Sequence, residues 1–214
     1  MDLSRRQLLG GLGLATAALG LPKGIGAERA SAQALDLTAS DLARDRFHTV
    51  LLPQAREALD RHAALITDRA TVGLVDFAAP SRSARFYLLD MADGQVISTH
   101  LVAHGRGSDP GNSGWVQTLS NRPGSNASCE GAFVTGQTYF GEHGRSRRLI
   151  GLEPRNDMAE ARAIVIHAAS YVDPDMASDL GRIGRSQGCF AVTPREIDDV
   201  LELLAPGSLL FAAK

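Results

Sequence analysis

Short apolar runs separated by turn residues dominate the sequence after residue 70. Gly, Pro, Asn, Asp and Ser stand between runs that have the length of strands, at residues 72–77, 85–91, 96–103, 132–139 and 163–167. Asp93-Gly94 joins the second run to the third and accepts the positive φ angles of a tight hairpin turn. The chain has 22 Gly but only seven Phe, three Tyr and one Trp, which favours tight turns over a helical bundle. We therefore expect a mainly β fold.

Helical periodicity occurs at two places. In residues 38–66 apolar side chains recur near a 3.6-residue period, which predicts an N-terminal helical segment capped by Thr38 or Ser40 and interrupted at Pro53. Residues 194–204 begin with Pro and predict a helix, and residues 208–212 predict a last strand. Residues 105–128 are rich in Gly, Ser, Asn and Pro, and predict a long loop that faces substrate.

The first 32 residues have the parts of a Tat-type export signal. Arg5-Arg6 precedes a weakly apolar run at residues 10–21, and Ala30-Ser31-Ala32 offers a small-residue cleavage site. The apolar run is too short and too rich in Gly for a membrane span. We expect cleavage after Ala32 and a soluble protein in the periplasm or another extracytoplasmic space, without stable membrane insertion. An uncleaved anchor is the alternative.

Charge and cysteine content exclude several functions. The formal net charge is −2, so the chain lacks the basic field that holds a nucleic-acid backbone, and nucleic acid is not expected as a partner. Cys129 and Cys189 are the only cysteines and allow at most one disulfide. Neither lies in a pattern with zinc-ligand spacing, so we expect neither a metal site nor a cofactor.

Cys189 and His167 form the densest chemical signal in the sequence. His167 ends the apolar run 163–167, where a sheet would hold its ring in a fixed orientation. Cys189 follows Gly188, whose bare backbone would let a substrate carbonyl approach. A thiol needs a base or cation beside it to attack at neutral pH. His167 is the candidate base, and the N–H groups of Gly188 and Cys189 are candidate donors to an oxyanion. A structural histidine and an inert buried cysteine are the alternative.

The stretch Ser186-Gln187-Gly188-Cys189 with upstream His167 resembles the signature of the L,D-transpeptidase catalytic domain, the YkuD-like family, and specifically its murein branch. Further stretches recur there in the same order, namely Val102-Ala103-His104-Gly105-Arg106-Gly107, Ser120-Asn121-Arg122-Pro123-Gly124-Ser125, Thr135-Gly136-Gln137-Thr138-Tyr139 and Gly184-Arg185-Ser186. The resemblance runs from Val72 to Lys214. It divides the chain into a signal peptide at residues 1–32, a helical segment at 33–69 and a catalytic domain at 70–214.

The resemblance implies a β-sandwich-like fold or mixed barrel with a helix after the catalytic cysteine. It implies cleavage of peptidoglycan stem peptides between an L-centre and a D-residue, with Cys189 as nucleophile, His167 as proton acceptor and donor, and Gly188 with Cys189 as the oxyanion hole. Ser186 takes the Ser/Thr place of the motif, and the Ala168 carbonyl orients the histidine ring. Gln187 and Ala191 depart from the His and Asn of the best-known members.

Other residues are candidates for contact with substrate. Arg185 suits bidentate binding of a diaminopimelate or D-alanine carboxylate. Tyr139 has a hydroxyl that reaches an oxyanion if it points into the site, and His104 and His143 lie beside Gly in loops. We expect Cys129 to be either distant from Cys189 or regulatory.

The expected activity is transfer of the acyl group to an amine, either a D-amino acid or diaminopimelate. Hydrolysis at the same site, as an L,D-carboxypeptidase or an amidase, stays an alternative. A wall-binding module without catalysis is the alternative from another class.

Overall fold

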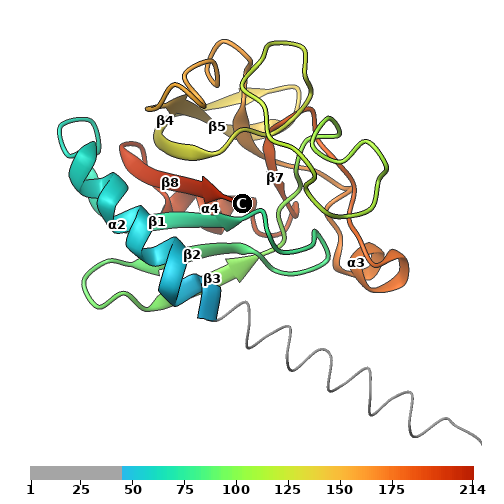
Figure 1. Ribbon diagram of the computed structural model, residues 1–214, viewed down its shortest axis with the longest axis horizontal. Coiled ribbons are helices and arrows are strands. Elements are labelled where there is room, and N and C mark those ends of the chain that lie inside the picture. Colours follow the sequence, from blue (N-terminus) through green and yellow to red (C-terminus); the bar gives the residue numbers. More distant parts are fainter. Residues whose placement is uncertain (1–44) are drawn as a thin grey trace, which may run out of the picture. The chain divides into compact units, whose positions relative to one another are not determined.

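The computed structural model describes residues 45–214, and its central element is one mixed sheet of eight strands (Figure 1). The sheet order is β3-β2-β1-β8-β4-β5-β6-β7. The strands are β1 (Asp68–Asp76), β2 (Phe86–Asp90), β3 (Val96–His100), β4 (Gly131–Gly141), β5 (Gly144–Gly151), β6 (Val165–Ala168), β7 (Phe190–Val192) and β8 (Ser208–Ala213). The pairs β1–β8 and β6–β7 are parallel, and the other neighbours are antiparallel.

The central strands are covered on both faces. Leu209 and Phe211 of β8 pack with the N-terminal helical residues, whereas Leu210 and Ala212 point into the other core. The covering residues form η1, a π-helix at Phe47–Leu51, and α2 (Leu52–Arg61). Burial on both faces explains why β8 reads as a continuous apolar run rather than an alternating one.

The second core joins the two ends of the sheet. It contains Phe86 of β2 together with Leu149 of β5, Ile166 of β6 and Phe190 of β7. Strands from opposite ends of the sheet order thus share one core, so the sheet curls around it. Helix α4 (Ile197–Leu203) adds Val200 and Leu201 to this core. The predicted mainly β class, with an N-terminal helical segment and a helix after Cys189, is confirmed.

Several local predictions are also confirmed. The Asp93-Gly94 hairpin joins β2 to β3, with Gly94 at a φ of 75° and the Asp90 N–H donating to Gln95 at 2.9 Å. Residues 105–128 are a loop without a strand of their own. Pro53 does not break the helical segment: it lies in the first turn of α2, directly after η1, where the helix changes from π to α.

Three elements were not predicted from the sequence: β5, β7 and α3 (Pro174–Leu180). Helix α3 lies in the connection from β6 to β7 and is capped by Asp173, whose Oδ1 accepts from the Asp175 N–H at 2.7 Å. In residues 45–214 no helix has the length and apolar character needed to cross a bilayer. The predicted export signal at residues 1–32 and the caps Thr38 and Ser40 lie outside the described residues.

Candidate active site

Cys189 is the last residue before β7 and ends a turn that two hydrogen bonds hold in place. The Ser186 Oγ donates to the Cys189 carbonyl at 2.7 Å and accepts from the Gly188 N–H at 3.1 Å. One buried hydroxyl therefore fixes both ends of the turn that carries the thiol. Because the Gly188 N–H is already paired with Ser186, the Cys189 N–H is the freer of the two predicted oxyanion donors.

Gly188 fills a place that no other residue fits. Its φ is +123°, and a Cβ there would lie 2.7 Å from Ile164 Cδ1 and 2.8 Å from the Ala127 carbonyl oxygen. Its own carbonyl accepts from Ser128 Oγ at 3.1 Å, and the same Oγ accepts from the Gly105 N–H at 3.0 Å. The turn is thereby joined to the loop at residues 105–128.

His167 lies on β6, the neighbour of β7. The parallel register pairs His167 with Ala191 and Ile166 with Phe190, so Cys189 enters the sheet beside the histidine strand. Nδ1 of His167 is 2.8 Å from the Ala168 carbonyl oxygen. Since a carbonyl only accepts, Nδ1 carries the proton and Nε2 is left with a free lone pair. This contact with Ala168 is the one that the family resemblance implies.

The thiol and the imidazole are both neutral near pH 7. Cys189 is partly exposed, and its Sγ is 3.5 Å from the Ala163 carbonyl oxygen, which is its hydrogen-bond partner. Burial raises the pKa of Cys189, although the Val165 N–H and the charge of Arg162 act against this. Burial lowers the pKa of His167, and the bond to Ala168 opposes that shift. Attack by Cys189 therefore needs a base to take the thiol proton.

Arg162 is a residue of this site that the sequence reasoning missed. Its Nη1 donates to the Ser120 carbonyl at 2.7 Å, and its Nη2 donates to Ser125 Oγ at 3.3 Å and to the Ala127 carbonyl. These bonds tie the loop at residues 105–128 to the turn before β6. The sequence signal for Arg162 was its position directly before the apolar run at residues 163–167. Solvent-exposed arginines also occupy such positions, so the signal was not specific.

Cys129 is close enough to Cys189 for the two thiols to influence each other. It is 1% exposed, packs in the second core, and forms no disulfide in the part of the chain that the structure describes. Burial raises the pKa of Cys129 to about 11, and Arg162 acts against this shift while Cys189 adds to it. Cys129 is thus an inert core thiol in this state.

Tyr139 shares a sheet face with the candidate base. The register pairs Tyr139 of β4 with Ser146 of β5, and Ser146 with His167 of β6. Paired residues point to one face, so the phenol lies two strands from His167. The guanidinium of Arg148 is 4.6 Å from the centre of the Tyr139 ring and covers it.

His104 was predicted to contact substrate, and this is wrong. The side chain is 0% exposed. Its Nδ1 is 2.8 Å from Arg85 Nη2, and its Nε2 is 3.4 Å from Asp109 Oδ2. Burial and the charge of Arg85 lower its pKa to about 4. His104 instead supports the site, because its carbonyl accepts from the Ser186 N–H at 2.9 Å.

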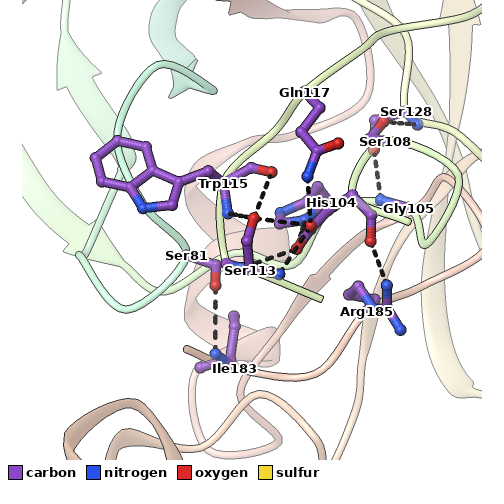
Figure 2. Close-up of polar contacts among 12 residues, drawn as sticks. Ser81, His104, Gly105, Ser108, Ser113, Trp115, Gln117, Ser128, Ile183 and Arg185 are labelled. Atoms are coloured by element: carbon purple, nitrogen blue, oxygen red, sulfur yellow. Dashed lines mark hydrogen bonds and ion pairs between the residues drawn. The ribbon is translucent and has the colours of Figure 1, made fainter. Parts of the chain in front are cut away.

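Asp109 organises the loop around the same buried group. Its carboxylate accepts from the Ser113 N–H at 2.9 Å and the Gly114 N–H at 2.8 Å, and also from Gln117 (Figure 2). Arg185, which we predicted to bind a substrate carboxylate, donates one N–H to the Asp109 backbone carbonyl. That bond turns part of its guanidinium toward the loop.

A partly exposed thiol on a fixed turn, with an imidazole of set tautomer on the neighbouring strand, is the arrangement that nucleophilic acyl-transfer enzymes use. The profile of the L,D-transpeptidase catalytic domain matches residues 44–213. The chain therefore belongs to this family. Among curated proteins, none matches the chain.

Several solved structures are similar at low identity. One is an L,D-transpeptidase in complex with imipenem, with 12% identity and a TM-score of 0.42 over 67% of this chain and 59% of that one. The L,D-transpeptidase from Mycobacterium smegmatis has 12% identity and a TM-score of 0.42, over 68% of this chain and 59% of that one. The L,D-transpeptidase from Xylanimonas cellulosilytica has 14% identity and a TM-score of 0.41, over 69% of this chain and 62% of that one. The chain thus covers less than two thirds of each of these proteins.

Proposed function

We propose that the chain is an exported cysteine L,D-transpeptidase that acts on peptidoglycan stem peptides through a thioester acyl-enzyme. Membership of the L,D-transpeptidase family supports an enzyme of the cell wall. The observation that carries the proposal is the turn that Ser186 ties beside His167, whose Nδ1 is bonded to the Ala168 carbonyl at 2.8 Å. A wall-binding module would need neither a fixed nucleophile nor a fixed tautomer.

Acylation begins when the Cys189 thiol turns away from the Ala163 carbonyl. Sγ attacks the carbonyl carbon of the bond between the L-centre and the D-residue, and Nε2 of His167 takes the thiol proton. The Cys189 N–H donates to the developing oxyanion. The imidazolium then gives its proton to the departing amine, which leaves a thioester on Cys189.

Deacylation repeats these steps with a second nucleophile. An incoming amine, from a D-amino acid or a diaminopimelate side chain, gives a proton to His167 and attacks the thioester. The new peptide bond forms, and the sulfur regains its proton from the imidazolium. If water takes the place of the amine, the same site is an L,D-carboxypeptidase or an amidase. Exposure of the Cys189 thiol leaves both routes open to test.

Mass spectrometry of stem peptides separates these outcomes. The purified protein is incubated with tetrapeptide muropeptides, with and without a D-amino acid as acceptor. Cys189→Ala removes the nucleophile, and Cys129→Ala is the matched control, because it removes the other thiol from the core. We expect exchange of the terminal residue that needs both the acceptor and Cys189.

Two other results would contradict transpeptidation. Shortened stems formed without acceptor, and lost in Cys189→Ala, would identify a hydrolase. Binding of muropeptides with no change in mass, equal for the protein and Cys189→Ala, would identify a wall-binding module. Exchange that persists in Cys189→Ala would exclude Cys189 as the nucleophile.

A further inference from the structure

The tip of the β4–β5 hairpin lies over the candidate base. β4 ends at Gly141 and β5 begins at Gly144, so Glu142 and His143 form the turn between them. The His143 ring stacks on the His167 ring, with centroids 4.3 Å apart and planes 23° from parallel. His143 is exposed, whereas His167 is only 2% exposed. The outer histidine therefore covers the inner one.

This stack supplies a restraint that the hydrogen bond to Ala168 does not. The bond at Nδ1 fixes one edge of the His167 ring, but it leaves the ring free to rock about that edge. A second flat ring against the face limits the rocking, because a tilt breaks the stacked contact. The register Ser146–His167 fixes where the hairpin passes β6, so the tip is held at this place by the ladder of β5.

We propose that His143 is a positioning residue of the catalytic base: its stacked ring holds His167 in the plane from which Nε2 takes the thiol proton of Cys189. The inference rests on the proposed function, since it assigns His143 a part in that reaction. It goes beyond the contact with substrate that the sequence suggested for this residue.

The surrounding charges decide how His143 affects protonation of the base. Glu142 lies in the same turn, and Arg145 of β5 is paired with Asp198 of α4 at 2.7 Å. Arg148 of β5 lies on the Tyr139 ring. The charge of Arg162 acts on the pKa of Cys189. After burial, the charge of His143 is a further cause that lowers the pKa of His167.

The test compares two substitutions that differ only in keeping a flat ring. His143→Phe keeps the stack and loses the charge, and His143→Ala loses both. Glu142→Ala is the control in the same turn. We expect kcat to fall roughly tenfold in His143→Ala with KM little changed, because a displaced base loses rate and not binding. His143→Phe should keep most of kcat, and its acid limb should move to higher pH, because the base loses a like-charged neighbour.

Two results would overturn the inference. One is a kcat in His143→Ala equal to that of the parent, and the other is an equal loss of kcat in His143→Phe and His143→Ala. A substrate-free measurement keeps this test apart from the proposed function. In an NMR titration of the imidazoles, His143→Phe should raise the pKa of His167, and an unchanged value would contradict the contact even if the protein had no transpeptidase activity.

Discussion

Arg162 places a positive charge beside both thiols of the domain, and this charge acts on the reactivity of Cys189. In Arg162→Gln we expect the pKa of Cys189 to rise further and alkylation by iodoacetamide at pH 7 to slow, by a factor on the order of tenfold. The measurement is the alkylation rate of Cys189 across pH, with Cys129→Ala as the background.

Arg185→Gln is the matched control for Arg162. Arg185 belongs to the motif itself, but its guanidinium donates to the Asp109 carbonyl and is not among the groups that shift the pKa of Cys189. Its loss should leave the alkylation rate near that of the parent. If both substitutions slow alkylation equally, the effect is a general one on the loop and not the charge of Arg162.

The turn that carries Cys189 depends on the glycine at position 188. Gly188→Ala puts a methyl group against Ile164 and the Ala127 carbonyl at a φ of +123°. Strain and overpacking together should cost about 2 kcal/mol or more of unfolding free energy and remove most activity. Denaturant unfolding and the muropeptide assay measure the two effects.

Gly124→Ala separates strain from packing. Gly124 also has a positive φ, +76°, but nothing lies within 4 Å of the added methyl group. Its cost should be near 1 kcal/mol, with activity kept. If Gly188→Ala were no less stable than Gly124→Ala, the close packing around Gly188 would be wrong.

Elements with a clear apolar pattern were predictable from the sequence, and those stabilised by their neighbours were not. β1, β2, β3, β4, β6 and β8 coincide with predicted runs within a few residues. β5 contains Arg145, Arg147 and Arg148, so its pattern resembles a solvated loop, and it becomes a strand because β4 and β6 pair with it. β7 has three residues, too few for a period to be read.

The same difference separates the site residues. Cys189, Gly188 and His167 could be proposed because His167 ended an apolar run, Cys189 followed a glycine, and both matched the motif of the family that the sequence resembles. His104 was a candidate for substrate contact beside Gly105, and only its burial next to Arg85 and Asp109 shows a structural role. Burial by residues distant in sequence cannot be read from a local motif.

At the scale of the whole molecule, the buried neutral His104 makes stability depend on pH. Its pKa is lowered from 6.5 to about 4, so between these values the unfolded chain binds a proton that the folded chain does not. The contribution of neutral His104 to the free energy of unfolding is complete above pH 6.5 and declines as the pH falls toward 4. The loss should reach roughly 3 kcal/mol of unfolding free energy.

Chemical denaturation at several pH values between 7 and 4 measures this loss. His104→Gln keeps a polar side chain but does not titrate, so its unfolding free energy should fall less steeply over the same range. If the unfolding free energies of the parent and His104→Gln fall equally steeply with pH, other groups account for the acid sensitivity.

The connection from β6 to β7 has a consequence for how such enzymes diversify. The candidate base lies on β6 and the candidate nucleophile directly before β7, and the chain between these parallel strands contains α3. Insertions or deletions near α3, before the turn at residues 186–189, would leave this strand pair and that turn in place. The segment around α3 can therefore vary in length and sequence while the pairing of His167 with Ala191 keeps its register.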